Sequence, residues 1–186
     1  METLEYTDVN AHIVARCKEG DRKAQYELYK LYSKSMFNVS MRITNDYTEA
    51  EDVLQESFLS AFRELHTFKG DSTFGSWLKR IVINKSITKV RSRRLQVEPM
   101  DDFQDFAEEA PEYDQEDMDY KVETIKKAIQ SLPDGYRVVL TLYLLEGYDH
   151  GEIAEILSIS EATSKSQYSR ARKKLLSLMQ EQSFFS

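Results

Sequence analysis

Residues 149–178 read DHGEIAEILSISEATSKSQYSRARKKLLSL, which is two helix-like segments separated by a short break. Asp149 and Glu152 have the spacing of a capping box, so the first helix is expected to begin there. The break, residues 158–160, is polar at both ends, and the second helix is expected to follow from Glu161. Two short helices joined by a three-residue turn predict a helix-turn-helix, whose second helix reads bases in the major groove of DNA.

The second of these helices has an apolar face and a polar, basic remainder. The apolar residues, which are expected to dock the helix on its domain, are Tyr168, Ala171, Leu175 and Leu178. Its early polar side chains can reach base edges, and its later Arg and Lys suit phosphates. An ordinary amphipathic helix with a solvated basic face explains the same pattern. Because nearby glutamates keep this domain close to neutral, its affinity for DNA is expected to be modest and sensitive to salt.

The N-terminal part of the chain also has helical periodicity. A first helix is expected to end at Gly20, and a second has apolar residues at positions 28, 32, 36, 39 and 43. Thr48 and Glu51 resemble a capping box that begins a third helix. One face of this helix is expected to hold Leu54, Phe58, Ala61 and Leu65, and the opposite side Asp52, Gln55, Glu56 and Ser60. A fourth helix is expected to begin near residues 71–73 and to continue to Arg94.

The rest of the chain fits the same class. Residues 120–131 predict a helix, and Pro133 fits the first position of a following helix that stops before Gly147. The chain has only six Gly and three Pro, which argues against an all-β or loop-rich architecture. The predicted fold class is therefore all-α, with an N-terminal helical bundle and a C-terminal helix-turn-helix domain.

Charge is distributed unevenly along a chain whose formal net charge is −7. Residues 66–94 have a net charge of +7, and residues 95–120 have a net charge of −11 with no cation at all. The acidic segment lacks helical periodicity and repels itself, so it is interpreted as an extended linker, with an acidic loop inside one domain as the alternative. The expected domains are residues 1–94 and 121–186, joined by the acidic linker 95–120.

The basic segment also contains rings, in the stretch FKGDSTFGSWLKRIVINKSITKVRSRR at residues 68–94. An unpaired base can stack on an aromatic ring for roughly 1–3 kcal/mol. Phe68 is expected in a loop and in contact with DNA, Phe74 is expected in the core, and Trp77 fits either place. The glycines 70 and 75 would let the backbone approach a base, and an amide at Asn84 can pair with a base edge. The cations that would hold the DNA backbone are Lys79, Arg80, Lys85, Lys89, Arg91, Arg93 and Arg94.

Other classes of function find little support in the sequence. Cys17 is the one cysteine, so no internal disulfide or multi-cysteine zinc site is expected, and its simplest reading is a small apolar residue on a helix. The three histidines are scattered, and no nucleotide-binding, metalloprotease or hydrolase motif is present. No catalytic residue, metal or cofactor is expected. With no apolar run long enough for a membrane span and no signal peptide, the protein is expected in the cytoplasm.

Three stretches together resemble bacterial RNA polymerase sigma factors, most closely the small extracytoplasmic-function (ECF) class of the sigma-70 family. They are DYTEAEDVLQESFLSAFREL, FKGDSTFGSWLKRIVINKSI and LPDGYRVVLTLYLLEGYDHGEIAEILSISEATSKSQYSRARKKLL. The resemblance implies that residues 1–94 act as sigma region 2 and residues 121–186 as sigma region 4. It implies core RNA polymerase, through its clamp helices, and promoter DNA as partners, and an anti-sigma factor as a further one. A monomer without a small-molecule substrate is expected.

The resemblance also implies roles for particular residues. Those expected to contact the core polymerase are Asp52, Gln55 and Glu56. Phe68, Asp71, Ser72 and Asn84 fall at positions that capture an unpaired base of the minus-ten element. With them, the minus-ten set comprises Trp77, Arg80, Lys85, Lys89 and Arg91. The set expected at the minus-thirty-five element is Thr163, Lys165, Ser166, Gln167, Arg170, Arg172 and Lys173.

Some positions depart from the family pattern. Residues 162–164 are Ala-Thr-Ser where the family often has Gly-Thr-Val, so Ser164 replaces an apolar residue and the helix is expected to pack differently. The acidic linker would, by analogy, run through the RNA exit region. The alternative function is a helix-turn-helix regulator of another class, whose N-terminal helices sense a ligand or dimerise.

Overall fold

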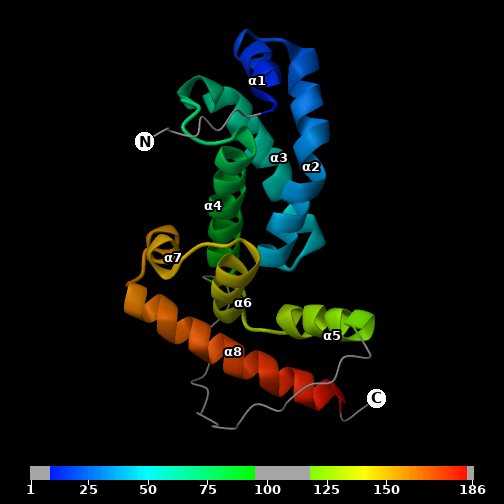
Figure 1. Ribbon diagram of the computed structural model, residues 1–186, viewed down its shortest axis with the longest axis vertical. Coiled ribbons are helices and arrows are strands. Elements are labelled where there is room, and N and C mark those ends of the chain that lie inside the picture. The colour runs from blue at the N-terminus through cyan, green and yellow to red at the C-terminus, as the bar shows by residue number, and fades with distance from the viewer. Residues whose placement is uncertain (1–8, 95–117, 184–186) are drawn as a thin grey trace, which may run out of the picture. The chain divides into compact units, whose positions relative to one another are not determined.

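Figure 1 shows the computed structural model of the chain, which describes residues 9–94 and 118–183. The described residues form helices and contain no strand, as the all-α class predicts. The chain divides into two compact units, residues 1–90 and residues 91–186. Residues 95–117 of the expected acidic linker, 95–120, lie outside the described residues. Its last three residues, 118–120, begin a helix.

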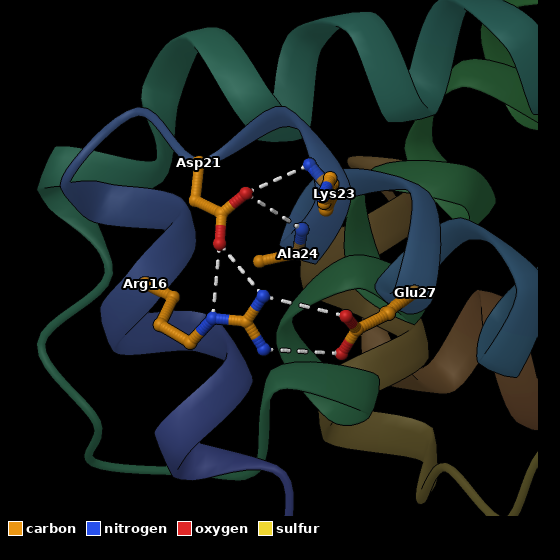
Figure 2. A network of polar contacts seen from close by, with 5 residues as sticks. All are labelled: Arg16, Asp21, Lys23, Ala24 and Glu27. Atoms are coloured by element: carbon orange, nitrogen blue, oxygen red, sulfur yellow. Dashed lines mark hydrogen bonds and ion pairs between the residues drawn. The ribbon is translucent and has the colours of Figure 1, made fainter.

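The first unit begins with α1 (Ala11–Lys18) and α2 (Arg22–Thr44), which meet at a sharp turn. Gly20 has φ of +89°, a conformation that favours glycine. Asp21 then caps α2 by accepting hydrogen bonds from the backbone N–H groups of Lys23 and Ala24, at 2.8 and 3.3 Å. Figure 2 shows that the same carboxylate pairs with Arg16, whose guanidinium also reaches Glu27. This network fixes the direction in which α2 leaves α1.

The third helix, α3 (Tyr47–Glu64), is capped differently from the prediction. Asp46 accepts a hydrogen bond from the Glu49 N–H at 2.8 Å, so the predicted Thr48–Glu51 capping box is wrong. Asn45 adopts the left-handed conformation at the end of α2, with φ of 55°. That turn places Asp46 in an extended conformation, which suits an N-cap residue, and the helix therefore starts at Tyr47.

The apolar stripes of α2 and α3 form the core of the first unit together with α4 (Phe74–Arg94). A short 3₁₀ helix, η1 (Leu65–Thr67), precedes the loop that leads into α4. The predicted inward residues of α3 are all buried, but Ser60, which was expected on the opposite side, is also buried. The fully enclosed side chains include Leu28, Ile43, Phe74, Leu78 and Ile83. Each contributes about 1.5–3 kcal/mol to folding through burial.

The second unit contains α5 (Met118–Gln130), α6 (Asp134–Leu140), the π-helical segment η2 (Thr141–Leu145), α7 (His150–Leu157) and α8 (Glu161–Ser183). Pro133 is the N-cap of α6 rather than its first helical residue. The predicted capping box of Asp149 and Glu152 is confirmed at the start of α7. Leu132, Leu140 and Ala171 are buried together, and Leu175 and Leu178 pack against them, which confirms the predicted docking face of α8.

The turn between α7 and α8 has the predicted length. Ser158 ends α7 in the left-handed conformation, with φ of 53°, and Ser160 caps α8 by accepting a hydrogen bond from the Thr163 N–H at 3.0 Å. The helix pair is therefore held by local contacts at both sides of its turn. Across the described ranges, no helix is both long and apolar enough to cross a membrane.

Candidate nucleic-acid interface

The loop between η1 and α4 places three aromatic rings together. Phe68 is only 8% exposed, and its ring centroid lies 5.3 Å from that of Trp77 and 6.1 Å from that of Phe74. Phe68 lies in a loop, as predicted, but its ring joins the other two at the edge of the core and leaves little surface for a base. The predicted contact of Phe68 with DNA stays a prediction. Phe74 is fully buried, as predicted, and Trp77 is half-buried. Trp77 thus offers the most accessible ring of the three.

The two glycines of this region each have a structural role, and their predicted approach to a base stays a prediction. Gly70 has φ of +85°, so the loop needs a residue without a side chain there. A Cβ at Gly75 would lie 2.8 Å from Cε1 of Tyr32, so this glycine lets α4 pack against α2. Between them, Asp71 and Ser72 are exposed.

The first turn of α4 is capped by Thr73, whose Oγ1 accepts a hydrogen bond from the Ser76 N–H at 3.1 Å. Trp77, Arg80 and Asn84 follow at spacings that place them along one side of α4. Arg80 and Asn84 are exposed. This side therefore combines a ring, a cation and an amide, the groups that stack on a base, bind a phosphate and pair with a base edge.

Two lysines of α4 are paired with acids of α3. Lys85 Nζ lies 3.9 Å from Glu56 Oε2, and Lys89 Nζ lies 3.3 Å from Asp52 Oδ2. The structure therefore brings together residues that the sequence assigned to two partners, DNA and polymerase. Gln55 is exposed beside these acids, and Arg91 is exposed in the last turns of α4, where the second compact unit begins.

Lys18, which sequence reasoning missed, also belongs to this region. Its ammonium donates a hydrogen bond to the Phe68 carbonyl oxygen at 2.6 Å and lies 5.5 Å from the centroid of the Phe68 ring. The two residues are fifty positions apart, and no local pattern in the sequence links them. Leu59 was missed as well, and at 70% exposure it is an apolar side chain on the same part of α3 as Gln55 and Glu56.

The second candidate surface is the exposed side of α8. Thr163 and Gln167 are half-buried, and the other predicted contacts are exposed, namely Lys165, Ser166, Arg170, Arg172 and Lys173. Lys165 Nζ lies 2.6 Å from Glu161 Oε1, and this hydrogen bond raises the pKa of Lys165. Ser166 donates to the Thr163 carbonyl oxygen at 3.0 Å. Four of these exposed side chains are basic, namely Lys165, Arg170, Arg172 and Lys173.

Ser164 holds this helix against α7. It is fully buried, and its Oγ is hydrogen-bonded to Nδ1 of His150 at 2.9 Å. The Tyr143 ring stacks on the His150 ring at 4.6 Å, and Tyr168 lies 4.5 Å from Tyr143. A polar pair flanked by rings therefore occupies the place where the resemblance leads one to expect an apolar residue. Among the described residues, no cluster of three or more His, Cys, Asp or Glu could hold a metal ion.

Comparisons with known proteins agree with the two units. Residues 28–96 match the family Sigma-70 region 2, and residues 123–175 match Sigma-70, region 4. The RNA polymerase sigma-H factor of Pseudomonas aeruginosa is 34% identical over 171 residues, covering 87% of this chain and 89% of that protein. The ECF RNA polymerase sigma factor SigM of Bacillus subtilis is 34% identical, covering 82% of this chain and 93% of the relative. The ECF sigma-E factor of Haemophilus influenzae is 32% identical, with coverage of 87% and 90%.

Solved structures show the same fold. The structure of CnrH in complex with the cytosolic domain of CnrY matches with a TM-score of 0.57 at 23% identity, covering 94% of this chain and 99% of that one. The sigma factor RpoE from Bartonella quintana, in complex with the anti-sigma factor NepR, matches with a TM-score of 0.55 at 23% identity, covering 83% and 96%. The comparisons favour the sigma-factor reading over a separate helix-turn-helix regulator. The chain belongs to the extracytoplasmic-function class of RNA polymerase sigma factors in the sigma-70 family, and it is a transcription initiation factor.

Proposed function

We propose that this chain binds core RNA polymerase through α3, opens the minus-ten promoter element with the loop and helix from Phe68 to Arg91, and reads the minus-thirty-five element with α8. The observation that carries the proposal is the presence, in one chain, of a basic helix with an accessible ring and a helix-turn-helix with a basic second helix. We further propose that it works by binding alone, without a catalytic residue, cofactor or small-molecule substrate.

The polymerase contact is assigned to the exposed side of α3. Asp52, Gln55 and Glu56 supply polar groups there, and Leu59 supplies an exposed apolar side chain. An apolar residue within a polar rim is the composition that protein interfaces favour. The clamp helices of the polymerase are the partner that the family membership suggests for this surface.

The opening of the minus-ten element is assigned to capture of separated strands. Separating one DNA base-pair step costs on average about 1.4 kcal/mol in lost stacking. Stacking one base on a protein ring returns roughly 1–3 kcal/mol. One or two trapped bases therefore offset the stacking lost from about one or two base-pair steps. This gain is enough to start opening of the duplex but not to complete it. Trp77 and Asn84 are the groups that we assign to this capture, with Arg80, Lys85 and Lys89 on the phosphates.

The duplex reader is assigned to α8. Thr163, Lys165, Ser166 and Gln167, early in the helix, are assigned to base edges, and Arg170, Arg172 and Lys173 are assigned to phosphates. An anti-sigma factor is proposed as a further partner, because the similar RpoE was solved in complex with one.

Reconstitution with core polymerase and a promoter library tests the proposal. We expect start sites that appear only when the chain is present, and an Asn84→Ala variant that binds polymerase normally but opens these promoters more slowly. Permanganate reactivity of unpaired thymines measures the opening. If the chain does not associate with core polymerase, or if Asn84→Ala loses polymerase binding and opening equally, the proposal is wrong.

A further inference from the structure

We propose that Lys18 of α1 is a positioning residue for minus-ten capture, because it anchors the loop that leads into α4. The inference rests on the proposed function of that loop. Its ammonium makes two contacts with one residue, a hydrogen bond of 2.6 Å to the Phe68 carbonyl oxygen and a cation–π contact of 5.5 Å with the Phe68 ring. Lys18 lies outside residues 28–96, the part of the chain that matches region 2.

The helix that carries Lys18 is itself firmly held. Ile13, Val14 and Cys17 are buried on its inner side. Arg16, two residues before the end of α1, is fixed by Asp21 and Glu27, as Figure 2 shows. Lys18 therefore reaches Phe68 from a rigid base, and a hydrogen bond from a charged donor is stronger than one between neutral groups.

The loop that Lys18 anchors has few other restraints. Its first residue, Phe68, is held by Lys18, by the rings of Phe74 and Trp77, and by a hydrogen bond from its backbone N–H to the Leu65 carbonyl oxygen at 3.2 Å. Its last residue, Thr73, caps α4. Between these points Asp71 and Ser72 are exposed, and Gly70 adopts a left-handed backbone conformation. Ordering such a loop on binding costs entropy, so a loop that is already fixed binds its ligand more tightly.

A purely structural contact would have a different signature. The Lys18 side chain is exposed, so replacing it removes little buried apolar surface and should leave the core of the first unit intact. Phe68 would keep its ring contacts with Phe74 and Trp77. The effect of losing Lys18 is therefore expected on the position of the loop, and not on the fold or on the polymerase-binding side of α3.

The test compares Lys18→Met, which keeps the length of the side chain but removes its charge, with Lys18→Arg, which keeps the charge. Lys23→Met is the matched control, because Lys23 is an exposed lysine of the neighbouring helix. In reconstituted holoenzyme we expect Lys18→Met to open promoters roughly tenfold more slowly, the change that corresponds to one charge-assisted hydrogen bond. Polymerase affinity should stay unchanged, and Lys18→Arg should restore most of the rate.

Fluorescence of Trp77 gives a second reading in the free chain. Trp77 is the one tryptophan, and its ring contacts Phe68, so a displaced loop should shift its emission in Lys18→Met but not in Lys23→Met. If Asn84→Ala impairs opening while Lys18→Met behaves like the control, the positioning role of Lys18 is wrong and the proposed function of the loop stands. The positioning role is also wrong if Lys18→Met loses polymerase binding as much as opening. If Asn84→Ala opens promoters at the normal rate, the proposed function of the loop fails, and this inference fails with it.

Discussion

At the residue scale, burial lowers the reactivity of the Cys17 thiol. Burial is the largest cause that raises the pKa of its thiol to about 11, and Asp21 adds to the effect while Arg16 opposes it. A thiol with this pKa is almost entirely protonated at pH 8, whereas an unfolded cysteine near 8.5 is partly ionised. The raised pKa contributes stability that is fully present below the unfolded value and is lost as the pH rises toward 11.

We therefore expect Cys17 to react with a thiol reagent at pH 8 at least about a hundredfold more slowly in the native chain than in denaturant. The absorbance of the coloured product released from a disulfide reagent measures this reaction rate, and the measurement is repeated at increasing urea concentrations. A native rate within a few-fold of the unfolded rate would contradict the burial of α1 against the core.

Asp21 has two roles that substitution can separate. Its hydrogen bond with Arg16 is the largest cause that lowers the pKa of its carboxyl, and its bonds to the Lys23 and Ala24 N–H groups add to this lowering. Asp21→Asn keeps an N-cap side chain but loses the ion pair, whereas Asp21→Ala loses both. At pH 7 we expect thermal stability to fall in the order wild type, Asp21→Asn, Asp21→Ala.

The pH dependence follows from the direction of that shift. A carboxyl whose pKa is lowered by folding contributes stability above its ordinary value, near 4, and loses it as the pH falls through the folded value. The difference in melting temperature between wild type and Asp21→Asn should therefore narrow below about pH 4. Glu19→Gln, at an exposed acid of the same turn, serves as the control. A difference that stays constant down to pH 2 would contradict the role of the ion pair.

At the scale of elements, the pairing of α3 with α4 links the two proposed surfaces of the first unit. Asp52 pairs with Lys89 and Glu56 with Lys85, so a polymerase that engages these acids would weaken both pairs and favour contact of the lysines with DNA phosphates. Exposed ion pairs contribute only about 0.2–1 kcal/mol each. We therefore expect the free Asp52→Asn, Glu56→Gln variant to bind a single-stranded minus-ten oligonucleotide about two- to tenfold more tightly at low salt.

Fluorescence anisotropy of a labelled oligonucleotide measures this change, with Glu64→Gln as a control at another exposed acid of α3. Because salt screens exposed charges, the gain should disappear near 1 M salt. An equal gain in the control would mean that net charge alone is responsible, and the specific coupling would be wrong.

One buried hydroxyl, that of Ser164, links α8 to α7 beside a cluster of rings. Ser164→Ala removes its hydrogen bond with His150, and the loss of one such bond is expected to cost about 1 kcal/mol. Amide hydrogen exchange in α7 and α8 should speed up accordingly, while exchange in the first unit stays unchanged. Ser169→Ala, at an exposed position of α8, is the control. If the amides of Ser164→Ala are protected from exchange as well as those of the wild type, the rings alone hold the helix.

The elements themselves were largely predictable, and the contacts between distant residues were not. The positions of Leu28, Val39, Leu54 and Phe58 repeat with the helical period, and burial follows that repeat directly. The cap of α3 was missed because the left-handed turn at Asn45 lets the helix begin earlier, with Asp46 as its cap, than the Thr48–Glu51 spacing predicts. The burial of Phe68 and its bond to Lys18 depend on how α1 packs against the loop, which no local pattern encodes.

At the scale of the whole molecule, the two proposed DNA contacts differ in how they divide between bases and phosphates. The minus-ten side of α4 adds an accessible ring and an amide, which are assigned to bases, to the cations that are assigned to phosphates. The surface of α8 is mainly cationic, and each phosphate that it neutralises adds about −0.9 to the slope of log affinity against log salt. The chain keeps a formal net charge of −7, so its attraction to DNA is local to these surfaces.

This division predicts how variants in the two units combine. Arg170→Ala should reduce the salt slope of holoenzyme binding to a promoter by about 1, and Lys165→Ala by less, because Glu161 already neutralises that lysine. Asn84→Ala should slow opening and leave the slope unchanged. Since the affected residues belong to separate units, the free-energy changes of Arg170→Ala and Asn84→Ala should add within about 0.5 kcal/mol in the double variant.

Binding isotherms over a range of salt concentrations, with opening measured in parallel, test this prediction. Lys34→Ala, at an exposed lysine of α2 that belongs to neither predicted set, controls for the loss of one positive charge. A slope that falls equally in Lys34→Ala would assign the effect to overall charge. A double variant much weaker than the sum would mean that upstream binding and strand capture are coupled, because a promoter released by α8 would then no longer be presented to α4.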